Sequence, residues 1–328
     1  MLEIKKRSFS SLEKEWNRLY ESGQNLSPYM DYAFQKLYKK YLWVSFGRIG
    51  FRYLCYAVLK DGEVICIIPV IERKGKRYLG GDWSPTGHLD FVYGQDITEE
   101  TLQEIILLFK NTIGGLRINK LPEGSKLQQL LSHTHEHADK PQVCVNIPFG
   151  DDYDSYFACL SKSVRQNNRT AKNRLAREEK TFRVETFVGG GECKAYVKEA
   201  YRIYTDRANK RYQHNMKAYE VFIKEYFQAV SLSLQRNNNR MWSFLFIDDE
   251  MAGFMGGFTT VDGTRVVIPR LAINGKYSLY CPGNLLIAET VRNLIETTSI
   301  RNLDLSRGDE TYKYSMGGVP YGNCEYEL

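Results

Sequence analysis

The carboxyl-terminal stretch 302–318 concentrates the residue types that could do chemistry. Leu303 and Leu305 alternate with polar residues, which predicts a short strand with one buried face. Arg307-Gly308-Asp309 then breaks the strand, so we expect polar side chains to gather around its carboxyl end, where open α/β sheets place ligand sites. A solvated loop is the alternative, although a purely structural turn rarely needs so many charges. The residues of this tip are Asp304, Ser306, Arg307, Asp309, Tyr312 and Lys313.

A second candidate is the segment Tyr280-Cys-Pro282-Gly283-Asn284, which opens an amphipathic helix predicted over 282–297. Proline is favoured in the first turn, where its missing N–H removes no hydrogen bond. A strand predicted over 265–273 comes before it. A helix start in this position suits phosphate, because unpaired N–H groups and the helix dipole both attract an anion. An ordinary helix start is the simpler interpretation of the same residues.

The segment 161–177 is rich in cationic residues. Ser163 with Gln166 predicts a capping box, so we expect a helix to start here. On that helix Arg165, Arg169 and Lys172 form a row about a quarter turn from the apolar stripe. The row could face an anion, or it could be a solvated helix face, as charge runs usually are. RNA binding is a third interpretation, but the aromatic residues that stack bases are not interleaved here.

Two further patterns are less specific. The glycines at 253, 256 and 257 lie in a strand predicted over 251–260, which indicates a bulge or a close backbone approach, or else tight packing under a helix. The histidines at 133, 135 and 137 alternate as zinc ligands on a strand would. No carboxylate or cysteine cluster lies near them in sequence. We therefore interpret them as a polar surface segment and predict no metal.

Length and composition limit the class of protein. A chain of 328 residues suits about two domains. A net charge of +6 suits an anionic ligand such as a nucleotide cofactor, without itself arguing for nucleic acid. The seven cysteines are scattered and lack CxxC spacing, so we expect reduced thiols in a cytoplasmic protein. No apolar run approaches the roughly 20 residues of a membrane span, and residues 1–20 lack the apolar core of a secretory signal.

The two halves of the chain repeat one plan. Each has helices, two apolar strands joined by an acidic tight turn, a second turn, a further helix and a short strand. The acidic turns are Asp61-Gly62-Glu63 and Asp248-Asp249-Glu250. The fold class we predict is α/β (α+β), with tandem domains that each hold a mixed twisted sheet flanked by helices. The boundary is expected near 140–150, which gives domains 1–145 and 146–328.

Three of these segments together resemble a known family. The basic segment 161–177, the helix entry Tyr280-Cys-Pro-Gly-Asn-Leu-Leu and the string Asp304-Leu-Ser-Arg-Gly-Asp-Glu-Thr-Tyr-Lys-Tyr look like the GNAT-related acyltransferases of the CelD/BcsL type. Those are tandem GNAT-fold proteins associated with cellulose and other exopolysaccharide synthesis. The first half resembles their degenerate amino-terminal GNAT domain, through Leu26-Ser-Pro-Tyr and Ile67-Ile-Pro-Val.

The resemblance implies transfer of an acyl group from acetyl-CoA or another acyl-CoA to a hydroxyl or amine of a sugar-containing acceptor. In the GNAT fold a splayed strand offers backbone N–H groups to the acyl carbonyl, and such donors stabilise the oxyanion of the tetrahedral intermediate. The next helix start receives the pyrophosphate. The standard pyrophosphate loop, Gln/Arg-x-x-Gly-x-Gly/Ala, is absent here. The residues that would contact the donor are Leu271, Ala272, Ile273, Tyr280, Pro282, Gly283 and Asn284.

The resemblance also suggests roles for the tip. Lys313 would offset negative charge on the acyl carbonyl, and Asp304 or Asp309 would accept the proton of the acceptor. An anionic part of the donor or acceptor would be held by side chains that include arginines, which suit bidentate phosphate contact. Those residues are Arg165, Arg169, Arg307 and Tyr312.

The chain is also similar to the Fem peptidyltransferases, which share the tandem GNAT architecture and take aminoacyl-tRNA as donor. Their motif of a lysine before Phe-Gly-Gly, in which the lysine stabilises the transition state, is approximated by Tyr312-Lys313-Tyr-Ser-Met-Gly-Gly. The heptad stretch of the coiled-coil arm of several Fem proteins is missing. Aminoacyl-tRNA is therefore the alternative donor. A non-catalytic scaffold in a glycan-synthesis complex is the alternative outside the enzymes.

Overall fold

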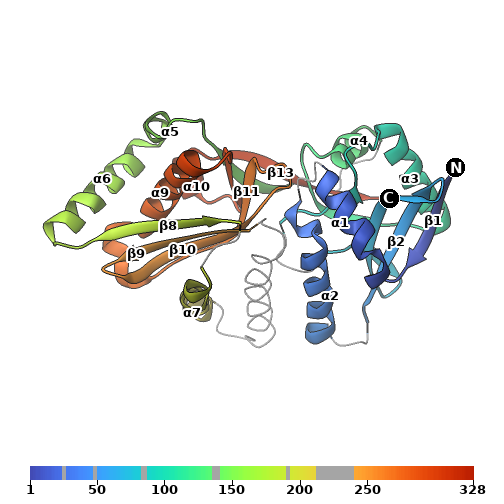
Figure 1. Cartoon of the computed structure of the whole chain (residues 1–328), viewed down its shortest axis with the longest axis horizontal. Helices are drawn as coiled ribbons and strands as arrows, with labels where there is room; N and C mark the ends of the chain where they lie inside the picture. The colour runs from blue at the N-terminus through green and yellow to red at the C-terminus, as the bar shows by residue number, and fades with distance from the viewer. Residues whose placement is uncertain (24–26, 47–49, 83–86, 135–140, 190–192, 212–239) are drawn as a thin grey trace. The chain divides into compact units, whose positions relative to one another are not determined.

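The computed structural model describes residues 1–23, 27–46, 50–82, 87–134, 141–189, 193–211 and 240–328. They form two compact units, Met1–Val143 with Tyr321–Leu328, and Cys144–Pro320. Each unit contains a mixed sheet flanked by helices (Figure 1), which confirms the predicted fold class.

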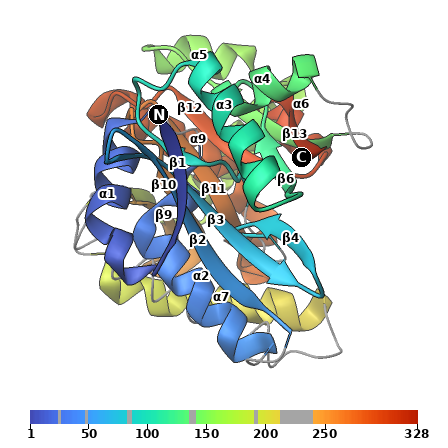
Figure 2. The same ribbon diagram turned by 90° about the vertical axis from the view of Figure 1, so that its right-hand side faces the viewer.

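The sheet of the first unit has the order β1-β2-β3-β4-β6-β13. The strands β1 (Leu2–Arg7), β2 (Arg52–Lys60), β3 (Glu63–Arg73) and β4 (Lys76–Leu79) pair antiparallel in sequence order and lie side by side in Figure 2. Asp61-Gly62 and Lys74-Gly75 join β2 to β3 and β3 to β4. All four turn residues have positive φ, as type I′ hairpin turns require. β6 (Arg117–Pro122) runs parallel to β4, and β5 (Val92–Tyr93) pairs with β3.

Four α-helices of the first unit are described. They are α1 (Glu13–Ser22), α2 (Tyr32–Phe46), α3 (Glu99–Thr112) and α4 (Lys126–Thr134). α3 starts at Glu99 because the Thr98 hydroxyl accepts the Thr101 N–H at 3.2 Å and caps the helix. Of the three histidines considered as zinc ligands, His133 lies in α4, and His135 and His137 lie outside the described residues.

The second unit repeats this plan. Its sheet has the order β7-β12-β11-β10-β9-β8, where β8 (Phe182–Val188), β9 (Arg240–Ile247), β10 (Glu250–Thr259) and β11 (Arg265–Ile273) form an antiparallel meander. β12 (Asn302–Arg307) runs parallel to β11, as β6 runs parallel to β4. β7 (Gln142–Pro148) covers the other edge of β12 in antiparallel register.

Helices cover both faces of this second sheet. α5 (Tyr153–Cys159), α6 (Lys162–Arg177) and α9 (Pro282–Thr297) lie on one face and α7 (Lys194–Arg211) on the other (Figure 1). The buried residues of α9 form one apolar core with Leu303 and Leu305 of β12. Because side chains of a strand alternate between faces, the intervening Asp304 points to the opposite face. α10 (Thr311–Ser315) follows β12.

The carboxyl terminus differs from the predicted domain limits. Residues 321–328, expected in the second domain, belong to the first unit. The reason is β13 (Val319–Glu327), which pairs antiparallel with β6, Cys324 opposite Leu121. Leu328 also exchanges backbone hydrogen bonds with Leu116 at 2.9 and 3.4 Å. The extra strand completes the sheet of the first unit.

The helices α5 and α6 are separated by Leu160 and Ser161, whose ψ angles of 154° and 148° are extended. The cap of α6 is Ser161, whose hydroxyl accepts the Val164 N–H at 3.3 Å. The prediction of Ser163 as the cap is therefore wrong by two residues, because Ser163 already lies inside the first turn.

The glycines of β10 confirm the predicted bulge and close approach. The pairing of β10 with β11 shifts register between Gly256 and Phe258. A Cβ on Gly257 would overlap the carbonyl oxygen of Val267 in β11, and a Cβ on Gly256 would lie 2.7 Å from the Trp242 ring. Only glycine permits this contact between the two backbones.

Candidate functional site

The parallel pair β11 and β12 opens part-way along its length. Three residue pairs join the strands, the last being Val267 with Asp304. β11 nevertheless continues to Ile273 and β12 to Arg307. No strand among the described residues pairs with the β12-facing edge of 268–273. Backbone N–H groups of a strand alternate between its two edges, and Asn274 donates its N–H to Ala252 of β10. Of the predicted donor residues, Leu271 and Ile273 therefore direct their N–H groups toward the β12-facing edge, and Ala272 directs its own toward β10.

The start of α9 is less open than the sequence predicts. Asn284 and Leu285 donate their N–H groups to the Cys281 carbonyl at 3.0 and 3.2 Å, and Pro282 has no N–H. Within the described residues, Gly283 is the predicted phosphate-binding residue whose N–H keeps no hydrogen bond. Tyr280 donates its hydroxyl to Glu178, which raises the pKa of the tyrosine, so this side chain faces the end of α6.

A cation that the sequence did not single out lies beside this helix start. Arg174 of α6 donates from Nη1 to the Leu279 carbonyl at 2.8 Å. Leu279 is two residues before Cys281, which precedes α9 in a left-handed conformation (φ 47°). Arg174 belongs to the basic segment 161–177. The packing of α6 on the turn 275–280 distinguishes it from the other arginines of that segment.

Lys313, the predicted catalytic cation, is buried at the tip. Its side chain is 2% exposed. Its Nζ donates to the carbonyl oxygens of Ser306, Arg307 and Gly308 at 3.2, 2.7 and 3.1 Å and lies 2.9 Å from Glu310. An ammonium has three protons, and these four oxygens use them all. In this structure Lys313 holds the tip 306–308 in place.

The two predicted proton acceptors have different environments. Asp304 is fully buried; its Oδ1 accepts the Ser306 N–H at 2.8 Å and its Oδ2 lies 3.8 Å from Arg265. Asp309 is exposed and accepts the Tyr314 hydroxyl, a hydrogen bond that raises the pKa of Tyr314. Asp309 is therefore the carboxylate that an acceptor could reach, whereas Asp304 supports the backbone of the tip.

The predicted anion-binding residues are divided between the tip and α6. Arg307 is half-buried and Tyr312 is 41% exposed at the tip. Arg165 donates to the Ala158 carbonyl in α5, and Arg169 is exposed. The two elements meet at one point, where the Ser161 N–H donates to the Ser315 carbonyl at 3.1 Å. Arg165 thus lies about one helical turn from the end of α10.

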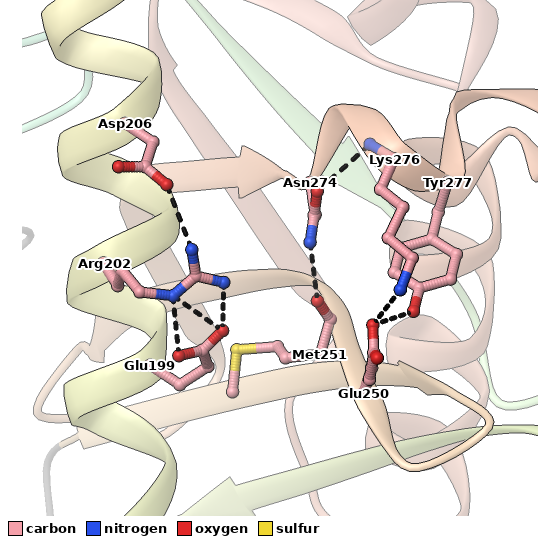
Figure 3. A network of polar contacts seen from close by, with 8 residues as sticks. All are labelled: Glu199, Arg202, Asp206, Glu250, Met251, Asn274, Lys276 and Tyr277. Carbon is pink, nitrogen blue, oxygen red and sulfur yellow. Dashed lines mark hydrogen bonds and ion pairs between the residues drawn. The ribbon is translucent and has the colours of Figure 1, made fainter.

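A polar network fixes the carboxyl end of β11 (Figure 3). Asn274 follows Ile273 directly and donates its N–H to the Ala252 carbonyl at 2.8 Å. On one side Glu250 accepts from both Lys276 and Tyr277, which lowers the pKa of Glu250. A hollow of about 460 Å³ separates this side from α7, and the residues that line it are Tyr196, Glu199, Arg202, Phe246, Asp249, Glu250, Met251 and Asn274.

Across the hollow, Arg202 of α7 completes the network in Figure 3. It contacts Glu199 at 2.6 Å and Asp206 at 3.1 Å. Its hydrogen bond lowers the pKa of Glu199. Sequence reasoning missed this cluster because α7, the β9–β10 turn and the end of β11 are far apart in the chain.

The segment that carries the opened strands matches a known family. Residues 162–314 match the Acetyltransferase (GNAT) domain. This GNAT segment contains α6, the meander β8–β11, α9, β12 and most of α10, so every predicted site residue lies within it. No curated protein sequence matches the chain.

Solved structures share the fold over almost the whole chain. FemX is 12% identical with a TM-score of 0.65, covering 99% of this chain and 97% of that one. A conserved protein of unknown function from Bacteroides thetaiotaomicron is 10% identical with a TM-score of 0.60, covering 99% of each chain. L-PGS from Bacillus licheniformis is 12% identical with a TM-score of 0.52, covering 93% of each. At such identities the similarity shows the fold alone.

Two features are absent from the described ranges. These ranges contain no group of three or more histidine, cysteine, aspartate or glutamate side chains placed to hold a metal ion. They also contain no helix that is long and apolar enough to cross a membrane.

Proposed function

We propose that this protein is a cytoplasmic acyltransferase that moves an acyl group, acetyl in the simplest case, from acyl-CoA to a hydroxyl or amine of a sugar-containing acceptor in glycan synthesis. One observation carries the proposal: β11 and β12 separate after Val267 and Asp304, within the segment that matches the GNAT domain. A carbonyl placed in that gap would meet backbone N–H groups of β11, which stabilise negative charge on its oxygen.

In the proposed reaction the oxygen or nitrogen of the acceptor forms a bond to the acyl carbon. The carbon–sulfur bond breaks, and the proton lost by the acceptor ends on the sulfur of CoA. Asp309 is the carboxylate we assign to that proton, because it is exposed at the tip. Asp304 and Lys313 are positioning residues that hold the tip from beneath.

The phosphates of the donor would lie at the start of α9. The Gly283 N–H supplies one donor there, and the Arg174 guanidinium, which reaches the neighbouring turn at Leu279, supplies positive charge. Arg165, Arg169 and Arg307 remain proposed contacts for an anionic part of the donor or acceptor.

Calorimetric titration with acetyl-CoA, longer acyl-CoAs and free CoA tests the proposal. Acetyl-CoA should bind at one site per chain and raise the melting temperature, since a ligand at 100 times its Kd stabilises the native state by about 2.7 kcal/mol. Thiol release should then increase in the presence of an amino sugar or an oligosaccharide acceptor. Failure of every acyl-CoA to bind contradicts the proposal.

A second candidate function takes aminoacyl-tRNA as the donor, as Fem proteins do. α6 favours it, because its 16 residues include six cationic and no acidic side chains. Among the described residues, Lys172 is the cation of α6 with an acidic partner, Glu289 at 2.6 Å. Like charges three or four residues apart destabilise a helix, as do cations at its amino end. Bound phosphates would offset both effects.

The two donors are distinguished by a direct comparison. Under the second candidate, charged tRNA alone supports transfer, and its binding weakens steeply with salt. Replacing the exposed Lys162 and Arg177 of α6 by glutamate should then reduce tRNA binding without changing acetyl-CoA binding. Transfer from acetyl-CoA with no need for tRNA excludes this candidate.

A further inference from the structure

Ser306 combines two unfavourable features at the end of β12. Its φ of 56° is in the left-handed region, which residues other than glycine rarely adopt. The residue is 7% exposed, and its Oγ has no hydrogen-bond partner among the described residues. A buried hydroxyl without a partner costs about 1–3 kcal/mol, and the backbone strain adds a similar amount. Folding stability therefore does not explain a serine at this position.

The surrounding residues hold the backbone of Ser306 but not its hydroxyl. The Ser306 N–H donates to Asp304 at 2.8 Å, and the Ser306 carbonyl accepts from Lys313 at 3.2 Å. Both polar groups of the main chain are thus fixed by buried charged side chains. Because contacts hold both the N–H and the carbonyl of Ser306, the strained conformation is maintained. Strained residues concentrate at functional sites.

The position of Ser306 relates it to the gap between the strands. The last parallel pair is Val267 with Asp304, and two residues farther along each strand are Pro269 and Ser306. Proline has no N–H, so β11 offers no backbone donor at this level. A carbonyl oxygen held in the gap here would need a donor from the β12 side. The Ser306 hydroxyl is a donor without another acceptor.

We propose that the Ser306 hydroxyl is a catalytic hydrogen-bond donor to the carbonyl oxygen of the acyl group, supplied from the β12 side of the gap between the two strands. This inference rests on the proposed function. As the acceptor attacks, the carbonyl oxygen gains negative charge and the hydrogen bond strengthens. Ser306 keeps its proton throughout, so no bond to this residue forms or breaks. Acyl-CoA is therefore recognised by its carbonyl at Ser306, and free CoA is not.

The test compares Ser306→Ala with the wild-type chain and with Ser315→Ala as a matched control. The Ser315 hydroxyl already donates to the Thr311 carbonyl at 3.1 Å. Release of the CoA thiol from acetyl-CoA should fall about 100- to 1000-fold in Ser306→Ala, as expected when a donor to a developing oxyanion is removed. The affinity for free CoA should not change, and Ser315→Ala should keep the wild-type rate.

The melting temperature provides the second readout. Ser306→Ala removes an unsatisfied hydroxyl, so its melting temperature should equal or exceed that of the wild type. Ser306→Gly, which also removes the strain, should melt higher still and lose the same activity. A wild-type rate in Ser306→Ala overturns the inference alone, as does a lower melting temperature, which would show a structural partner for the hydroxyl. A wild-type chain that neither binds nor cleaves acetyl-CoA overturns the proposed function as well.

Discussion

The Nζ atom of Lys313 lies 2.7 Å from the carbonyl oxygen of Arg307. Through that contact Lys313, a candidate catalytic cation, supports the backbone of the tip 306–308. The same ammonium also donates to the carbonyl oxygens of Ser306 and Gly308, on either side of Arg307. Lys313 reaches them because the first turn of α10 directs its side chain back toward β12. We therefore assign the proposed chemistry of the tip to its backbone and to the hydroxyl of Ser306.

Lys313→Met should destabilise the protein. It leaves three carbonyl oxygens without their donor, so we expect the free energy of unfolding to fall by about 1–3 kcal/mol in urea denaturation. Lys162→Met is the control, because Lys162 is exposed on α6, and it should change stability by less than about 0.5 kcal/mol. Equal stability of both variants would show that the ammonium does not hold the tip.

Gly257→Ala should disturb β11 and with it the donor site. The added Cβ overlaps the Val267 carbonyl oxygen, so we expect a loss of about 1–3 kcal/mol in stability and weaker binding of acetyl-CoA. Gly275→Ala is the control, since no atom lies within 4 Å of the Cβ that it would add, and it should change stability little. If Gly257→Ala binds acetyl-CoA as the wild type does, the bulge does not shape the site.

Arg174→Ala should weaken the binding of acetyl-CoA and of free CoA by the same factor, about tenfold, because it removes positive charge from the start of α9. The control is Arg177→Ala, three residues along the same helix and exposed. Calorimetry measures both affinities. A variant that loses affinity for acetyl-CoA alone would place Arg174 at the acyl group instead of the phosphates.

Asp90 of the first unit should make stability depend on pH near neutrality. Burial raises its pKa to about 7, although the Phe91 N–H and the Tyr93 hydroxyl donate to it. The folded state therefore binds a proton that the unfolded chain has released above about pH 4. The contribution to stability is complete at low pH and is lost as pH rises through 7.

Asp90→Asn removes this titration. Relative to the wild type, the variant should gain about 3 kcal/mol in its free energy of unfolding between pH 5 and pH 8. Urea denaturation at the two pH values measures the difference, and Asp96→Asn, an exposed carboxylate nearby, provides the control. A pH-independent difference between Asp90→Asn and the wild type would mean that Asp90 does not titrate in this range.

Local patterns predicted the elements of the site. The alternation of Leu303 and Leu305 gave β12, and Pro282 marked the first residue of α9. The glycines of β10 indicated a close backbone approach, which the structure shows at Val267. These features depend on near neighbours in the chain, so their residues are enough to predict them.

Features that depend on distant residues could not be predicted. The environment of Lys313 requires the left-handed backbone of Ser306, which turns three carbonyls toward one point. The place of β13 depends on the free edge of β6, some two hundred residues earlier in the sequence. Arg174 differs from the other arginines of α6 only through its contact with the turn at Leu279. Helical periodicity gives a direction for each side chain but not the element that it meets.

Amide hydrogen exchange along β11, with and without a non-hydrolysable thioether analogue of acetyl-CoA, tests the central claim most directly. The amide protons of 270–273 that face β12 should exchange more slowly once the analogue is bound, because its acyl arm then occupies the open edge. Free CoA, which lacks the carbonyl, should protect them less. Protection at the start of α9 with none along 270–273 would contradict the assignment of the gap between β11 and β12 as the acyl site.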